Sequence, residues 1–284
     1  MQVNPFDAIL PADMAKKAED LGVVKANKDG LSAFVLALTA GVFIGIAFVF
    51  YISVTTGGVA LPYGLNKFIG GIAFSLGIIL VVVCGGELFT SSVLTTVARA
   101  SGRISNKAFI KNWAIVYLGN FTGAMFLVAL MFYSQHYFQA NGAVGANYLY
   151  VAKAKLGHDF LQAVALGILC NLMVCLAIWM SFGARSVTDK VIVLVLPISM
   201  FVTAGFEHCI ANMFLIPMAI VIKNIAPESF WIENGLQIEQ FYQLTWGDFL
   251  LNNLLPVTIG NIIGGGILVA LTYWAIYLRK PAAH

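Results

Sequence analysis

The sequence predicts an all-α integral membrane protein with six transmembrane helices, arranged as an inverted repeat of three plus three spans with two broken helices. The prediction rests on composition, on long windows without charge, and on a motif that recurs in the second half. Of the 284 residues, 60% are hydrophobic and 10% are charged, whereas soluble domains carry about a quarter of charged residues. This composition excludes a cytosolic enzyme, a disordered chain and a nucleic-acid-binding domain.

Charge-free windows locate the spans. Four windows lack Asp, Glu, Lys and Arg and exceed the roughly 20 residues that a spanning helix needs: 30–66, 112–152, 160–184 and 249–278. Two more apolar stretches, 68–98 and 191–222, each contain one acid near the middle, Glu87 and Glu207. Either stretch would form a straight helix about 46 Å long, against a hydrocarbon core of about 30 Å. We therefore predict that the second and fifth spans are interrupted at the acid.

Basic residues set the predicted orientation. Twelve lie in the segments that six spans would place inside and four in the outer segments, so both termini are expected to face the cytoplasm. The expected organisation is a cytoplasmic N-terminal tail (1–29), a first three-helix repeat (30–134), an outer connection (135–158), a second three-helix repeat (159–279, with an outer connection at 224–246) and a cytoplasmic C-terminal tail (280–284). The N-terminal tail is expected to contain a short amphipathic helix, which either gates or caps the inner mouth.

The two halves repeat one another in sequence. Segment 118–133 recurs at 259–274 with seven of 16 residues identical. Gly85-Gly86-Glu87 stands against Gly205-Phe206-Glu207. Three spans per half give the halves opposite orientations, and interruptions at matching places indicate a translocation path. GxxxG spacings predict either close helix packing or subunit contacts: Gly41/Gly45, Gly119/Gly123 and Gly260/Gly264.

Two acids and one imidazole lie at the predicted breaks. We expect Glu87 and Glu207 to cap the half-helices that follow them, the alternative being contact with a permeating species. His208 is the only imidazole predicted at membrane depth and stands where the first half has Leu88, which we count among the constriction residues. It is interpreted either as a functional group or as a core histidine that bonds Glu207 or a carbonyl. Glu207, His208 and Cys209 are adjacent and point in different directions, so no metal and no cofactor is expected.

Other residues near the breaks have two interpretations each. The polar residues Thr90, Asn171 and Asn261 either bond across helices or line a path. Apolar residues around the breaks either pack or form constrictions: Phe74, Ile78, Phe89, Val174 and Phe201. The four cysteines form no CxxC pair and are expected to be buried thiols.

These residues resemble the formate/nitrite transporter family. The similarity covers nearly all of residues 4–280 and is carried by Asn4-Pro5-Phe6-Asp7 and by the motifs at 85–90, 205–214 and 256–261. The resemblance implies an aquaporin-like subunit with its own pore, assembled as a homopentamer in the lipid of the bacterial inner membrane. It also implies site roles: a central His208 opposite Thr90, a periplasmic constriction at Phe74 and Phe201, a cytoplasmic one at Ile78, Phe89 and Val174, polar pore residues Asn171 and Asn261, and Lys155 at the outer entrance.

The resulting expectation is a passive, pH-sensitive channel for formate or a similar small weak-acid anion, with proton exchange at His208. Moving a bare ion into a dry environment costs up to tens of kcal/mol, whereas neutralising a carboxylate at pH 7 costs about 4.5 kcal/mol. Nitrite and hydrosulfide remain open as substrates. A neutral-solute channel of the aquaglyceroporin class is the other alternative. Paired Asn-Pro-Ala motifs, which would indicate that class, do not occur, and the only Asn-Pro in the sequence is Asn4-Pro5. An ion-driven transporter also remains open as an alternative. An enzyme is not expected, because the sequence offers no nucleophile–base pair.

Overall fold

A computed structural model describes residues 9–279 of the chain, and within that range all regular structure is helical. The elements are α1 (Pro11–Ala26), α2 (Gly30–Thr55), η1 (Gly58–Ala60), α3 (Tyr63–Cys84), α4 (Phe89–Ser92), η2 (Val93–Thr95), α5 (Thr96–Ala100), α6 (Asn106–Tyr133), η3 (His136–Phe138), α7 (Ala143–Leu156), α8 (Phe160–Gly183), α9 (Val187–Thr203), α10 (Cys209–Ile225), α11 (Glu228–Glu233), η4 (Ile238–Phe241), α12 (Trp246–Asp248), η5 (Phe249–Leu254), α13 (Leu255–Ile262), η6 (Ile263–Leu271) and α14 (Thr272–Tyr277). The motif Asn4–Asp7, the tail 280–284 and the first eight residues of the predicted N-terminal tail lie outside the described residues.

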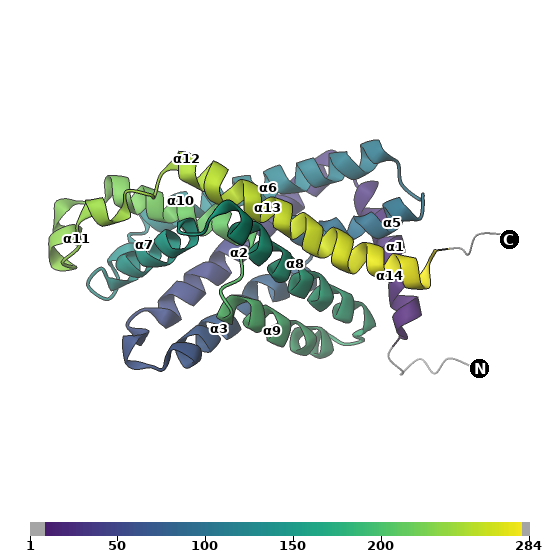
Figure 1. Cartoon of the computed structure of the whole chain (residues 1–284), viewed down its shortest axis with the longest axis horizontal. Coiled ribbons are helices and arrows are strands. Elements are labelled where there is room, and N and C mark those ends of the chain that lie inside the picture. Colours follow the sequence, from purple (N-terminus) through teal and green to yellow (C-terminus); the bar gives the residue numbers. More distant parts are fainter. Residues whose placement is uncertain (1–8, 280–284) are drawn as a thin grey trace.

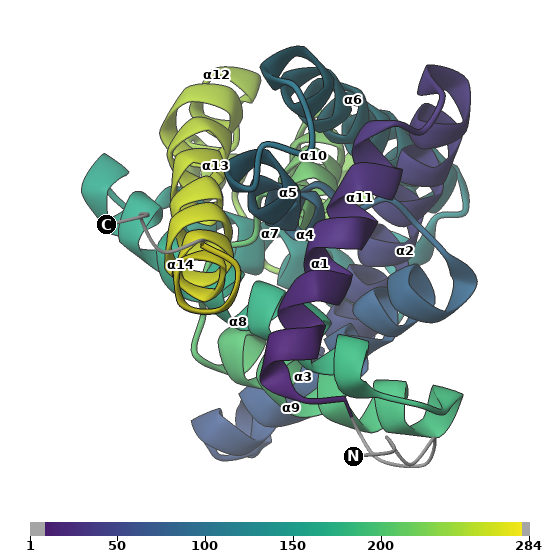
Figure 2. The ribbon, with the colours of Figure 1, turned by 90° about the vertical axis from the view of Figure 1, so that its right-hand side faces the viewer.

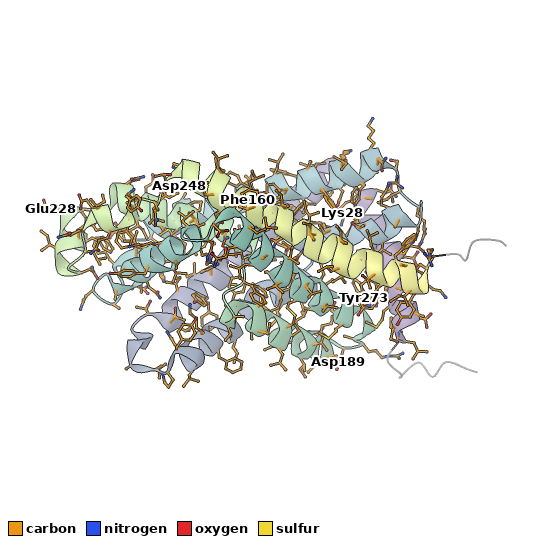
Figure 3. The ribbon with its side chains drawn as sticks, viewed as in Figure 1. Lys28, Phe160, Asp189, Glu228, Asp248 and Tyr273 are labelled. Carbon is orange, nitrogen blue, oxygen red and sulfur yellow. The ribbon has the colours of Figure 1, made fainter. Side chains whose placement is uncertain are left out.

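The helices form an elongated bundle with α1 and α14 at one end and α11 at the other (Figure 1). Glu228 of α11 marks the end opposite α1 when the side chains are drawn (Figure 3). Viewed from the α1 end, that helix crosses in front of the bundle (Figure 2). Figure 2 also shows that the continuous helical run from α12 to α14 stands beside α8 rather than across the end.

Five helical stretches among the described residues are long and apolar enough to cross a membrane: Gly30–Thr55, Tyr63–Cys84, Asn106–Tyr133, Phe160–Gly183 and Ile238–Tyr277. The stretch predicted as the fifth span contains α9 and α10, which are 17 residues each and are separated by residues 204–208. The total of six crossings stays a prediction.

Contacts between equivalent residues show how the two halves are related. Ser75 of α3 donates to the carbonyl of Val195 in α9, 120 positions away, over 3.3 Å. The hydroxyls of Tyr117 and Thr258, 141 positions apart, lie 3.0 Å from each other in α6 and α13. Residues that contact their own equivalents lie at a symmetry axis. The sequence repeat therefore corresponds to a pseudo-twofold relation that passes between α3 and α9.

The GxxxG glycines allow close helix packing inside the subunit. A Cβ at Gly123 would collide with the carbonyl oxygen of Leu38 in α2, and one at Gly264 with that of Ile168 in α8. Each half thus brings its third long helix against its first through a small residue, as such motifs do in membranes. Of the two interpretations left open by the sequence, the structure supports helix packing.

One cysteine differs from the expectation. Cys170, Cys175 and Cys209 are buried, but Cys84 is exposed. Cys84 is the last residue of α3, where the chain leaves the helix at Gly85.

Candidate functional site

The first break lies between α3 and α4. Gly85 adopts a left-handed φ of 89°, and Gly86 donates its N–H back to the Val81 carbonyl over 2.8 Å. This is the geometry by which glycine ends a helix. The chain then runs extended to Leu88 before α4 begins at Phe89.

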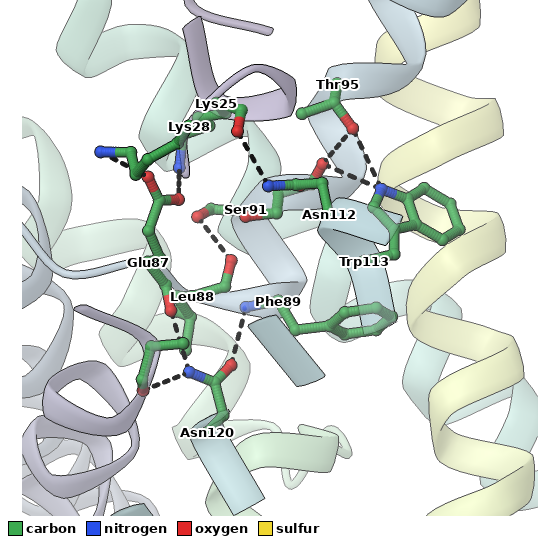
Figure 4. Close-up of polar contacts among 12 residues, drawn as sticks. Lys25, Lys28, Glu87, Leu88, Phe89, Ser91, Thr95, Asn112, Trp113 and Asn120 are labelled. Carbon is green, nitrogen blue, oxygen red and sulfur yellow. Dashed lines mark hydrogen bonds and ion pairs between the residues drawn. The ribbon is translucent and has the colours of Figure 1, made fainter. Parts of the chain in front are cut away.

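An asparagine holds the extended residues of this break (Figure 4). Asn120 of α6 donates its amide to the carbonyls of Glu87 and Ala37, over 2.9 and 2.7 Å, and accepts the N–H of Phe89 over 2.8 Å. Its side chain is fully buried. Asn120 therefore satisfies the backbone groups that the interruption leaves without helical partners. The sequence repeat contained Asn120, but its role was not predicted.

Glu87 pairs with lysines instead of capping α4. Its Oε2 lies 2.6 Å from Lys25 Nζ at the end of α1, and its Oε1 lies 3.4 Å from Lys28 Nζ. Figure 4 shows both lysines beside the carboxylate and Asn112 donating to the Lys25 carbonyl, a bond of 3.1 Å. The expected cap by this carboxylate is wrong, because its side chain faces the two ammonium groups while the Asn120 amide accepts the Phe89 N–H.

The second break repeats this arrangement. Gly205 has a left-handed φ of 75°. Asn261 donates to the carbonyls of Glu207 and Gly167 over 3.0 and 2.8 Å, and accepts the N–H of Cys209 over 3.0 Å. Asn120 and Asn261 are 141 positions apart and make matching bonds, so each asparagine satisfies the backbone groups of one break.

Glu207 also pairs with a cation and does not cap α10. Its Oε1 lies 2.8 Å from Lys155 Nζ and 3.7 Å from His158 Nε2. Its Oε2 accepts from the Asn212 amide over 2.6 Å and from the Asn253 amide over 3.4 Å. The predicted cap is wrong here too, because His208 caps this helix.

The cationic residues belong to the repeat as well. Lys25 and Lys28 precede Lys155 and His158 by 130 positions each, and Asn112 precedes Asn253 by 141. Asn253 donates to the Lys155 carbonyl over 3.2 Å, as Asn112 does to that of Lys25. Helix α1 is therefore the counterpart of α7. The Lys-x-x-Lys and Lys-x-x-His spacings ahead of the two long helices were the available sequence signal.

His208 and Thr90 join the two halves at the centre. His208 Nε2 lies 2.9 Å from Thr90 Oγ1, and both side chains are buried. The Ala211 N–H donates to His208 Nδ1 over 3.1 Å, which makes the ring the N-cap of α10. Because a backbone N–H can only donate, Nδ1 carries no proton. Nε2 therefore carries the proton of a neutral ring and donates it toward Thr90.

Two cavities approach this pair from opposite ends. The first, of about 520 Å³, is called the α7 cavity, and its lining includes Lys67, Phe74, Lys155, His158, Phe201, Glu207 and His208. The second, of about 410 Å³, is called the α1 cavity, and its lining includes Lys17, Lys25, Lys28, Glu87, Ser91, Thr95 and Lys190. The lysines make the α1 cavity strongly positive. Helix α1 forms part of its wall, and Lys17 donates to the Phe182 carbonyl over 2.8 Å.

The predicted constriction residues fall into two groups. Phe74 and Phe201 line the α7 cavity with ring centroids 6.0 Å apart, and the Phe201 ring stacks on His208 at 6.0 Å. The second group is buried and is absent from the lining of both cavities: Ile78, Leu88, Phe89 and Val174. The Phe89 ring packs against Tyr117 and Trp113 at 4.9 and 5.8 Å. That the residues of these two groups act as constrictions stays a prediction.

Asn171 links the second half to the first. Its amide donates to the carbonyls of Asn261 and Thr90, over 2.6 and 3.1 Å. The position 130 residues earlier is Gly41, where a Cβ would collide with the Asn120 carbonyl oxygen. Asn171 and Asn261 therefore both bond across helices, and whether they also touch a permeating species stays a prediction.

No group of three or more His, Cys, Asp or Glu within residues 9–279 is arranged to hold a metal ion. The site consists instead of one imidazole–hydroxyl pair between two positively charged cavities.

Comparisons with known proteins relate the whole chain to one family. The family model described as formate/nitrite transporter matches residues 12–275. The chain is 58% identical over 281 residues to the formate channel FocA of Escherichia coli strain K12, with 99% of both chains covered. It is 45% identical over 273 residues to the formate channel FocA of Haemophilus influenzae, which covers 96% of this chain and 95% of that one. A solved pentameric formate channel with formate bound matches with a TM-score of 0.84 and 56% identity, over 88% of this chain and 98% of that chain.

Proposed function

The chain belongs to the formate/nitrite transporter family, and we propose that it is a passive, pH-sensitive channel for formate in the bacterial inner membrane. Each subunit of a homopentamer carries its own pathway, which the similarity to a pentameric formate channel supports. The α7 cavity opens to the outside and the α1 cavity to the cytoplasm, where both termini lie. The excess of basic residues on that side supports this orientation.

The observation that carries the proposal is the His208–Thr90 pair between the two cavities. The α7 cavity reaches His208, whereas the buried residues that we assign to the cytoplasmic constriction, Ile78, Phe89 and Val174, are apolar. A bare carboxylate that passes such residues loses its hydration at a cost of up to tens of kcal/mol. Protonation at pH 7 costs about 4.5 kcal/mol. Passage as the neutral acid is therefore the less costly route.

The pair can assist in two ways. The Nε2–H and the Thr90 hydroxyl are both donors, so an arriving carboxylate can replace Thr90 as acceptor and receive a bond from the hydroxyl. The ring acquires a positive charge only by protonation at Nδ1, which removes its bond to the Ala211 N–H. Losing a helix cap costs about 0.5–2 kcal/mol. An anion beside the ring offsets this cost, because an opposite charge favours the protonated imidazole.

Reconstituted vesicles test the mechanism with matched variants. His208→Asn keeps a side-chain oxygen that can cap α10 but removes the titratable ring, and His208→Phe removes both. We expect both to lower formate flux about tenfold or more, or to abolish its pH dependence. If neither the flux nor its pH profile changes in His208→Asn, the proposed proton exchange is wrong.

Substrate class is tested in the same vesicles. Permeability to formate, nitrite, hydrosulfide and glycerol is compared across pH. Formate permeability well above that of glycerol is expected for an anion channel, whereas dominant glycerol permeability contradicts it. Flux that follows the formate gradient is expected of a channel, and saturable uptake with a fixed proton stoichiometry would instead identify a coupled transporter.

A further inference from the structure

The two halves differ in charge at one repeated position. Lys28 Nζ lies 3.4 Å from Glu87 Oε1, and the residue 130 positions later, His158, has its Nε2 3.7 Å from Glu207 Oε1. The first half thus places a permanent cation beside its buried acid, and the second half places an imidazole there. Imidazole is the side chain whose ordinary titration falls between pH 5 and 8.

We propose that His158 is an anion-recruiting residue whose protonation adds positive charge to the α7 cavity when the solution at that mouth is acidic. Small carboxylates are then drawn into the cavity more strongly from an acidic exterior than from a neutral one. This inference rests on the proposed function and extends it with a residue, outside the His208–Thr90 pair, that determines how anions enter.

The geometry shows that the charge of His158 is not needed to neutralise Glu207. Lys155 Nζ occupies Oε1 at 2.8 Å, and two amides donate to Oε2. At 3.7 Å the His158 ring is too far for a normal hydrogen bond. Because the lysine already balances the carboxylate, a proton on His158 changes the net charge of the cavity instead of completing an ion pair.

The ring can also exchange protons with the solution. Its side chain is 24% exposed, whereas that of Glu207 is 1% exposed. His158 follows the end of α7 and precedes Asp159, the N-cap of α8, whose carboxylate accepts the Gln162 N–H over 2.8 Å. The lining of the α7 cavity includes His158 together with Lys155 and Glu207.

The remaining groups around the cavity leave it positive. Lys67 of α3 donates to the Tyr51 hydroxyl over 3.2 Å and lies over the Tyr63 ring at 5.8 Å, and none of residues 9–279 supplies it with a carboxylate partner. Other titratable or charged groups line the α7 cavity together with His158: Tyr51 of α2, Tyr63 and Lys67 of α3, Tyr150 and Lys155 of α7, and Glu207 and His208 before α10. Asp159, the neighbour of His158 in the chain, is not part of that lining. Lys67 gives a constant attraction for anions, to which His158 adds a variable one.

The α1 cavity lacks this variable charge. Its described lining holds four lysines and one acid, and lysine stays protonated between pH 5 and 8. Lys28→His is therefore the matched variant that transfers the titratable group to the other cavity.

The experiment is equilibrium exchange of isotopically labelled formate in vesicles with the same pH on both sides, from pH 5 to 8. Orientation then does not matter, and the ratio of wild type to His158→Lys cancels the pH dependence of formate and of His208. We expect the two fluxes to be similar at pH 5 and the wild type to be about two- to fivefold slower at pH 8. His158→Gln should stay at the slow level throughout, and Lys28→His should acquire a pH-dependent ratio.

The outcomes separate the two proposals. A flux ratio of wild type to His158→Lys that is constant from pH 5 to 8 overturns the role of His158, since a purely structural change acts equally at every pH. The role of His158 is also overturned if the pH dependence of this flux ratio is unchanged in about 1 M salt, where the Debye length is about 3 Å. An absence of formate exchange above empty vesicles contradicts the proposed function itself.

Discussion

The polar clusters around Glu87 and Glu207 have the same construction and different surroundings. In both, an asparagine holds the broken backbone, a lysine pairs with the acid, and a second asparagine donates to the carbonyl of that lysine. Two of the differences between the clusters concern groups that can titrate: His208 stands against Leu88, and His158 against Lys28. The repeat thus keeps the groups that satisfy the backbone and varies the groups that can titrate, and both imidazoles belong to the second half.

The largest expected effect concerns the acids. Glu207 has a side chain 1% exposed and accepts from a lysine and two amides, whereas Glu87 is 6% exposed and its lysines are about a quarter exposed. Removing one partner of a buried pair costs about 3–5 kcal/mol. We expect Glu207→Ala to lower stability by that amount and Glu87→Ala by less, because Lys25 and Lys28 can turn to water.

Thermal unfolding of both variants in detergent, at equal protein and lipid concentrations, measures the difference. Each acid serves as the control for the other, since both lie at a break held by an equivalent asparagine. A larger loss in Glu87→Ala would show that burial does not set the difference between the clusters.

An intermediate effect is expected where the two halves are alike. A Cβ at Gly123 or at Gly264 would collide with a carbonyl oxygen of the facing helix. We expect each Gly→Ala variant to lose about 1–3 kcal/mol of stability through overpacking, and the two losses to be similar. Melting temperatures test this, with Gly64→Ala as a control, because a Cβ there meets nothing within 4 Å.

Strongly unequal losses of stability at Gly123 and Gly264 would show that the two halves do not pack their helices in the same way. An unchanged melting temperature in both would mean that the helices separate without cost, against the close approach of α2 to α6 and of α8 to η6.

The smallest effect concerns the starts of α3 and α9. Helix α3 begins after Pro62 without a side-chain cap, whereas α9 has a capping box of Ser186 and Asp189. Asp189 lies at the outer edge of the bundle (Figure 3). Hydrogen bonds from the backbone N–H groups of Ser186 and Arg185 lower the pKa of Asp189 below its ordinary value of 3.8.

A lowered pKa in the folded state means that the ionised carboxylate stabilises the fold. This contribution is fully present above the unfolded pKa of 3.8 and disappears as the pH falls through the folded value. We expect Asp189→Asn to have a slightly lower melting temperature than the wild type at neutral pH. The difference should vanish in strong acid, and a difference independent of pH would contradict the assignment.

The sequence predicted interruptions at the two acids because two local signals coincide there, and the structure ends α3 at Cys84 and α9 at Thr203. An acid in a long apolar stretch and a glycine close to it can be recognised from the sequence alone. The repeat at 85–87 and 205–207 supports the same prediction independently. Sequence reasoning assigned the wrong partners to the acids. Lys25 lies on α1, 62 positions from Glu87, and Lys28 lies between α1 and α2. Only their spacing ahead of α2, which Lys155 and His158 repeat ahead of α8, distinguishes them from other basic residues of the N-terminal segment.

The sequence by itself determined the membrane class, the repeat and the position of His208 beside a helix interruption, because hydrophobicity and glycine act through short stretches of chain. The tertiary structure decided which groups meet: Asn120 and Asn261 at the broken backbone, α1 as the counterpart of α7, and the Ala211 N–H that fixes the proton of His208 on Nε2. Hydrogen bonds and ion pairs act over about 3–4 Å and depend on direction. Such distances exist only once helices that are far apart in the chain have packed together.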